Sequence, residues 1–167
     1  MAIKNYTTKI AVEKTVAEIE LILSKHGANK ILKDYNGAGY ITGISFMVET
    51  PAGSIPFKLP IDLPAWTALI NRAVEEKKLP LRFENDADQA RRVGWRVIKD
   101  WVDAQLAIVE TQTVSIEQVF LPYAFDALTN KTVYEKFLEH TDKFIALPEN
   151  TKEFEQNEKD LDKGVEE

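Results

Sequence analysis

Residues 86–110, DADQARRVGWRVIKDWVDAQLAIVE, form the longest uninterrupted helical pattern in the chain. Apolar or small residues recur there at spacings of three and four, which places them along one side of a helix; they are Ala90, Gly94, Val97, Trp101, Ala104 and Ile108. The opposite side carries Arg91, Arg92, Trp95, Arg96 and Lys99. We therefore expect a long central helix with one buried apolar side and one basic, aromatic side that faces solvent.

The segments around this helix predict an α+β fold. Alternating apolar residues at 30–35, 40–49 and 54–60 are typical of strands, and residues 50–53, Thr-Pro-Ala-Gly, are typical of a hairpin turn. Capping-box patterns begin at Thr15, Ser115 and Thr132, where we expect helices to start. The expected architecture is a small antiparallel sheet of about three strands packed against three or more helices, in a single domain over residues 1–147.

Charge is distributed unevenly along the 167 residues. Residues 1–100 hold fifteen Lys and Arg against twelve Asp and Glu, a net charge of +3, whereas residues 101–167 hold six against fifteen, a net charge of −9. Residues 148–167 are rich in charge and poor in apolar residues, so they are expected to form an acidic C-terminal extension. Such a tail either confers solubility or competes with nucleic acid for a basic surface elsewhere on the chain.

Composition and motifs disfavour most enzymatic and exported classes. The absence of cysteine excludes disulfides, thiolate zinc sites and cysteine nucleophiles. The sequence has no G-x-S-x-G, H-E-x-x-H or EF-hand pattern, and its two histidines are His26 and His140, which form no local metal site. Since no signal-peptide or membrane-spanning run is present either, we expect a cytoplasmic, non-enzymatic protein without metal or cofactor.

The basic side of the long helix is the principal candidate site. Guanidinium groups bind phosphate, and an indole among them offers a base a stacking surface, which together favour single-stranded nucleic acid as the ligand. The spacing leaves a second, structural interpretation open, in which Trp95 widens the apolar stripe by packing with Val102 under a neighbouring element. Arg92, Arg96 and Lys99 each have an aspartate four residues away, so the face could neutralise itself through pairs along a solvated helix.

A protein contact is the alternative function. Residues 119–125, VFLPYAF, are apolar for a connecting segment, and Trp66 adds aromatic character to a second predicted helix. These residues predict an inhibitor of a host factor or a self-assembling oligomer.

One distributed block resembles a pattern in short phage and prophage accessory proteins. It consists of Arg92-Val-Gly-Trp-Arg96, Asp100-Trp101, Ala104-Gln105 and Val119-Phe-Leu-Pro-Tyr123, and it covers about a fifth of the chain. The resemblance implies a small accessory protein in the cytoplasm of a bacterial host, which serves phage replication or recombination or opposes a host defence. The block transfers no catalytic residue.

Overall fold

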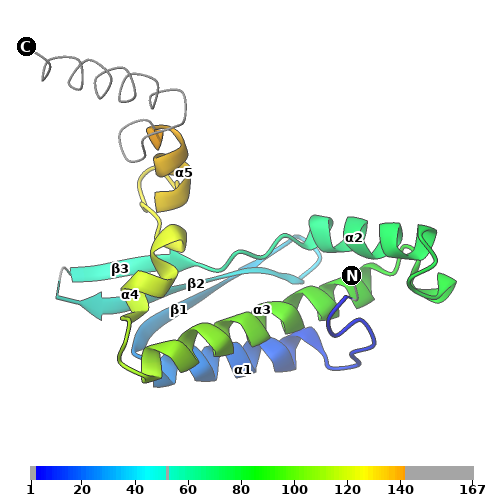
Figure 1. The fold of residues 1–167 in the computed structure, drawn as a ribbon, viewed down its shortest axis with the longest axis horizontal. Coiled ribbons are helices and arrows are strands. Elements are labelled where there is room, and N and C mark those ends of the chain that lie inside the picture. Colours follow the sequence, from blue (N-terminus) through cyan, green and yellow to red (C-terminus); the bar gives the residue numbers. More distant parts are fainter. Residues whose placement is uncertain (1–2, 52, 142–167) are drawn as a thin grey trace, which may run out of the picture.

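The chain forms a three-stranded sheet and a set of helices, seen in a computed structural model that describes residues 3–51 and 53–141 (Figure 1). In chain order the elements are α1 (Val12–Lys25), β1 (Ala28–Tyr35), β2 (Ile41–Thr50), β3 (Gly53–Lys58), α2 (Leu63–Glu75), the 3-10 helix η1 (Leu81–Phe83), α3 (Ala87–Glu110), α4 (Ile116–Phe120), the 3-10 helix η2 (Leu121–Tyr123) and α5 (Val133–Leu138). The predicted α+β class is confirmed, with α3 as the long helix.

The sheet is antiparallel with the strand order β1-β2-β3. The predicted hairpin turn joins β2 to β3, where Thr50 pairs with Gly53 and the glycine adopts a φ of 110°, a conformation that glycine tolerates best. The outer edge of β3 is occupied, because Phe125 donates its backbone N–H to the Pro56 carbonyl at 3.0 Å and Ala124 forms a bridge with Phe57. The edge of β1 has no such neighbour among the described residues.

Helices α1 and α3 lie side by side along one face of the sheet (Figure 1). The larger core cluster lies between them and the strands, and its largest fully buried side chains include Trp95, Phe57, Phe120 and Ile44. A smaller cluster joins α2 and η1 to the first turns of α3 through Ile70, Ala73, Val74, Leu79, Phe83, Ala90 and Val93. Helix α3 therefore contributes to both clusters.

Local sequence explains where α3 begins. The Asp86 carboxylate accepts from the backbone N–H of Gln89 at 2.8 Å, which satisfies one of the free amides of the first turn. The helix then runs for 24 residues to Glu110.

No helix in the described ranges is long and apolar enough to cross a membrane. The acidic extension predicted for residues 148–167 lies outside the described residues.

Candidate functional site

Trp95 does not face solvent, and this corrects the predicted orientation of the basic side of α3. Its side chain is fully buried in the larger core cluster, whereas Ile108, which was assigned to the buried stripe, is 47% exposed. The residues buried along α3 are Gln89, Ala90, Val93, Gly94, Trp95, Ile98, Val102 and Leu106. The physical reason is that α3 packs against α1 and the sheet as well as against α2, so it carries two apolar stripes. The indole of Trp95 cannot stack with a base in this fold.

Arg96 and Lys99 are held by carboxylates of the chain. The Arg96 guanidinium forms an ion pair with Glu18 of α1 at 2.5 Å, and the Lys99 ammonium pairs with Asp103, four residues further along the same helix. The pair predicted between Lys99 and Asp103 is thus present, whereas Arg96 reaches across to another helix. The first pair links α3 to α1 and the second lies along α3, so both cations are engaged and are poorly disposed to hold a phosphate.

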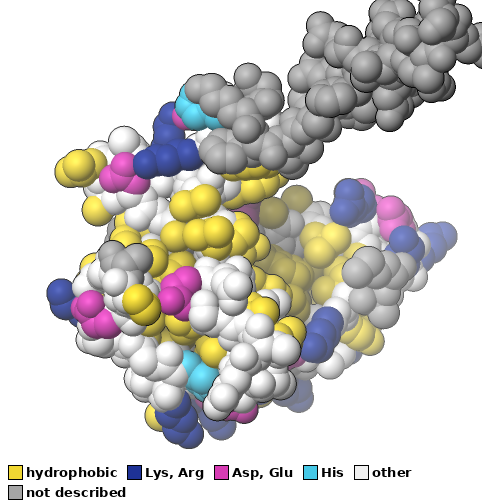
Figure 2. Space-filling model, turned by 60° about the vertical axis from the view of Figure 1, so that its left-hand side comes forward, with side chains coloured by type: hydrophobic (Ala, Val, Ile, Leu, Met, Phe, Trp, Pro, Cys, Tyr) yellow, Lys and Arg dark blue, Asp and Glu magenta, His cyan; other side chains and the backbone are white. Residues whose placement is uncertain are grey.

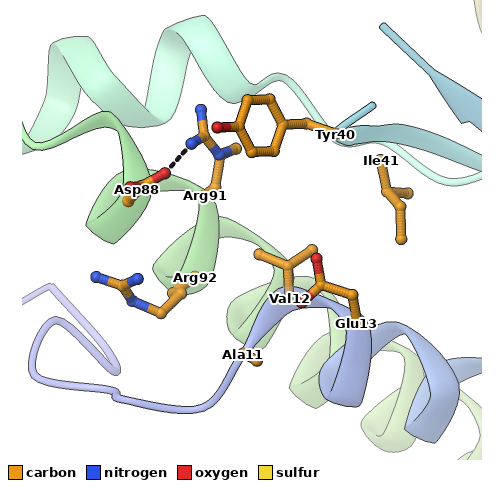
Figure 3. Close-up of a pocket in the computed structure, with 8 residues that line it drawn as sticks. All are labelled: Ala11, Val12, Glu13, Tyr40, Ile41, Asp88, Arg91 and Arg92. Carbon is orange, nitrogen blue, oxygen red and sulfur yellow. Dashed lines mark hydrogen bonds and ion pairs between the residues drawn. The ribbon is translucent and has the colours of Figure 1, made fainter. Parts of the chain in front are cut away.

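Arg91 and Arg92 line a small pocket of 230 Å³ next to the start of α1 (Figure 3). The guanidinium of Arg91 lies 3.9 Å from the ring centroid of Tyr40, a cation–π contact, and also pairs with Asp88. The remaining lining residues are Ala11, Val12, Glu13 and Ile41. With two arginines and two carboxylates around it, the pocket has no net formal charge. Tyr40, 43% exposed, is the aromatic residue that accompanies the arginines here, and no sequence pattern identified it.

Arg92 also has a structural partner. Its Nε and Nη2 atoms donate to the Gln89 Oε1 atom at 3.1 and 2.9 Å. Gln89 is buried, and its Nε2 atom donates to the backbone carbonyls of Tyr6 and Thr8 at 2.6 and 3.0 Å. Arg92 therefore orients the glutamine that fastens the segment before α1 to α3. The five predicted site residues thus separate into three groups: Arg91 and Arg92 line a pocket, Arg96 and Lys99 are held in ion pairs outside it, and Trp95 lies in the core. Arg91 is itself paired with Asp88.

A larger groove lies between the β3–α2 connection and the C-terminal lobe, by which we mean residues 121–139. Its volume is 770 Å³, and it is lined by Lys58, Leu59, Pro60, Ile61, Pro122, Tyr123, Asn130, Thr132, Tyr134 and Glu135. Seen from the side that Figure 2 brings forward, hydrophobic side chains gather around a hollow, and most charged side chains lie at the margin. Trp101 of α3 supports Tyr123 edge-on, with the ring centroids 5.3 Å apart, so one wall of the groove is anchored to the core.

The C-terminal lobe exposes apolar residues densely. Of the eleven large hydrophobic side chains exposed in the described residues, five belong to this lobe: Leu121, Leu128, Val133, Tyr134 and Leu138. None of the six residues of α5 is buried. The predicted interaction segment, residues 119–125, contributes Pro122 and Tyr123 to the groove, while its Phe120 and Ala124 are buried. Trp66 belongs elsewhere, since it packs against Gly94 of α3.

Polar contacts hold this exposed lobe together. The Lys136 ammonium donates to the Asp126 carboxylate at 2.7 Å, and this hydrogen bond, with one from the Leu128 backbone amide at 2.8 Å, lowers the pKa of Asp126 to about 2. A capping box at Thr132 starts α5, and the hydrogen bonds from the Thr132 backbone and side chain lower the pKa of Glu135. The lobe is therefore built by charge and capping rather than by a core of its own.

Comparisons with known proteins add no family to this geometry. No protein-family model, curated protein or solved structure matches the chain. Within the described residues, no group of three or more His, Asp or Glu side chains is placed to hold a metal ion.

Proposed function

We propose that this chain is a non-enzymatic protein-binding module whose groove takes an extended, apolar segment of a partner. The observation that carries the proposal is the concentration of exposed apolar side chains on the C-terminal lobe beside a groove of 770 Å³. Exposed apolar residues cluster on a soluble surface mainly where another surface covers them. The volume is within the range of roughly 300–1,000 Å³ in which ligand sites are usually found.

The chemistry of the groove favours an extended segment over a helix or a polar ligand. Pro60 and Pro122 remove backbone donors from the walls, and Tyr123 and Tyr134 supply flat apolar faces with a hydroxyl at the edge. Aromatic-lined grooves of this kind bind extended, proline-containing peptides, whose side chains insert between the rings. Lys58 and Glu135 leave one charge of each sign at the rim, which would orient the segment.

Peptide selection with the full chain tests this function. We expect display libraries of random peptides to yield sequences rich in proline and aliphatic residues, and Tyr134→Ser to weaken their binding at least about tenfold, as truncation of an aromatic anchor does. Tyr134 is 54% exposed, so the substitution leaves the fold intact; Tyr35→Ser, at a tyrosine 56% exposed on β1, is the matched control. A library without enriched peptides, or enriched peptides indifferent to Tyr134→Ser, contradicts the proposal.

Binding of single-stranded nucleic acid is the second candidate, now with a different site. It is favoured by Arg91, Arg92 and the half-exposed ring of Tyr40 around one pocket, and the acidic segment 148–167 would act as the electrostatic competitor. Either function suits a small phage-type accessory protein in the cytoplasm of a bacterial host, which remains part of the proposal and rests on the sequence block quoted above.

An oligonucleotide titration separates the two candidates. Fluorescence anisotropy with a labelled single strand at about 50 mM salt should show binding that weakens steeply as salt rises. Tyr40→Ala should reduce the affinity, and deletion after residue 147 should raise it. Arg96→Ala serves as a control, because that arginine is engaged with Glu18 outside the pocket. Absence of binding without the acidic segment would leave the peptide groove as the single candidate.

A further inference from the structure

We propose that two copies of this chain pair through the free edges of their β1 strands and form a continuous six-stranded sheet. The regular part of the β1–β2 ladder runs from Lys30 to Asp34 and is bounded by an irregularity at each end. Its midpoint is Leu32, whose side chain is 69% exposed although it is a large aliphatic residue. The partner is thus a second copy of the same strand, in antiparallel orientation.

Backbone geometry shows that this edge can donate and accept hydrogen bonds. The Ile44 carbonyl of β2 accepts from Leu59 on the β3 side at 2.9 Å, so Ser45 and Met47, one residue out of phase, direct their backbone groups toward β1. Their partners Leu32 and Lys30 direct theirs back toward β2. Ile31 and Lys33 therefore point their backbone N–H and carbonyl groups outward, to the unpaired edge.

The side chains of the same segment are complementary to themselves about Leu32. Lys30, Leu32 and Asp34 lie on the sheet face away from the helices, because Ile31 between them pairs with Phe46 of the core. A two-fold axis at Leu32 places Lys30 of each copy opposite Asp34 of the other, with the two leucines in contact at the centre. Neither Lys30 nor Asp34 forms an ion pair within the described ranges.

Charges select this register over its neighbours. A two-fold axis at Lys33 would place the two Lys33 side chains directly opposite each other, and a two-fold axis at Ile31 would place Lys30 opposite Leu32. Both pairings are less favourable than the opposite charges that an axis at Leu32 brings together. Lysine on an edge strand usually prevents such pairing. Here Lys33 is already neutralised by Glu20 of α1 at 2.7 Å, and Lys30 would meet a carboxylate. The β3 edge offers no equivalent, since residues 124 and 125 occupy it.

Sedimentation of the full chain over a range of concentrations provides the test. We expect a concentration-dependent species with twice the chain mass of 19.0 kDa. Lys30→Glu and Asp34→Lys each place like charges opposite each other twice per dimer and should raise the dissociation constant about tenfold. The double variant exchanges the two charges, so it should restore the affinity of the unmodified chain. A circular-dichroism spectrum unchanged from that of the unmodified chain shows that the single variants fold.

A second pair of variants tests the backbone contribution. Lys33→Pro removes an outward N–H without removing a bond to β2 and should abolish the dimer, whereas Lys33→Ala removes the same ion pair with Glu20 but keeps the N–H and should preserve it. A monomer at all concentrations overturns the proposal, as does a dimer that survives Lys30→Glu and Lys33→Pro. Dimerisation and peptide binding can fail separately. Tyr134→Ser, which tests the groove, does not change β1 and should therefore leave the dimer intact.

Discussion

The buried side chain of Trp95 combines a large stabilisation from apolar burial with the cost of an unpaired N–H group. Its indole buries a large apolar surface, yet the Nε1 atom has no hydrogen-bond partner among the described atoms. An unpaired buried N–H costs about 1–3 kcal/mol, whereas truncating a buried tryptophan to alanine costs about 3–5 kcal/mol. The apolar burial is therefore the larger effect.

We accordingly predict that Trp95→Ala lowers the free energy of unfolding by about 3–5 kcal/mol, as measured by urea denaturation. Ile108→Ala is the control on the same helix, since this isoleucine is 47% exposed and its truncation should cost less than about 1 kcal/mol. Equal effects of the two substitutions would mean that the indole is not in the core.

Gly94 and Gly43 are two glycines at which an added Cβ atom would come too close to a neighbouring side chain. A Cβ atom at Gly94 would meet the Trp66 ring at 2.7 Å, and one at Gly43 would meet the Asp34 Oδ2 atom at the same distance. The indole is packed between α2 and α3, whereas the carboxylate is the end of a flexible, exposed side chain. We predict that Gly94→Ala destabilises the fold by about 1–3 kcal/mol, and that Gly43→Ala changes stability by less than about 0.5 kcal/mol. Thermal unfolding monitored by circular dichroism distinguishes them.

Residues on α3 also explain where sequence reasoning succeeded and where it failed. Ala90 and Gly94 were assigned to the buried side correctly, and Trp95 was not. The period of the apolar residues indicates that a helix has a buried side, but it does not indicate how many elements pack against that helix. Helix α3 packs against other elements on two sides. The groove was only partly predictable for a related reason: its walls come from residues 58–61 and 122–135, which only the fold brings together.

Among the helices, capping-box motifs predicted the first residue correctly with one exception. Capping boxes begin α4 at Ser115 and α5 at Thr132, as the sequence indicated. The pattern at Thr15 did not mark a start, because α1 begins at Val12 and Thr15 is buried within it, donating its hydroxyl to the Ala11 carbonyl at 3.3 Å. A four-residue pattern describes a possible cap, but α1 begins after Ala11, whose side chain forms no capping hydrogen bond.

The C-terminal lobe should loosen selectively in acid. The pKa of Asp126 is lowered to about 2, chiefly by the hydrogen bond from Lys136. A carboxyl whose folded pKa lies below its unfolded value of about 3.9 contributes stability above that value and loses it progressively as pH falls toward 2. The pKa values of Glu135 and Glu139 are lowered as well, which adds contributions of the same sign.

We predict that amide protection in α5 declines between about pH 4 and pH 2 while protection in α3 persists, as measured by hydrogen exchange. Asp126→Asn should remove most of the acid-dependent part, and Asp88→Asn, at a carboxylate paired with Arg91 on α3, should leave the lobe unchanged. Simultaneous loss of protection in both helices would show that the lobe has no separate local stability.

The whole molecule depends on α3 as the element shared by two core clusters. The larger cluster includes Trp95 and Ile98, and the smaller one includes Ala90 and Val93 from the preceding turns of the same helix. Sequence composition predicted one domain, but not that its core would be divided, since both clusters have the same residue types. A helix that must be intact for either cluster to form couples them, so we expect them to unfold together.

The three tryptophans allow this coupling to be measured, because Trp66 packs against the smaller cluster and Trp95 and Trp101 belong to or pack against the larger one. Their three indole N–H resonances should disappear at one common urea concentration. Ile70→Ala, a truncation confined to the smaller cluster, should destabilise the fold by about 2–5 kcal/mol and move all three midpoints equally. If the Trp66 signal were lost first while the other two kept their midpoints, α2 would be an independently unfolding unit, and α3 would be a long helix without a coupling role.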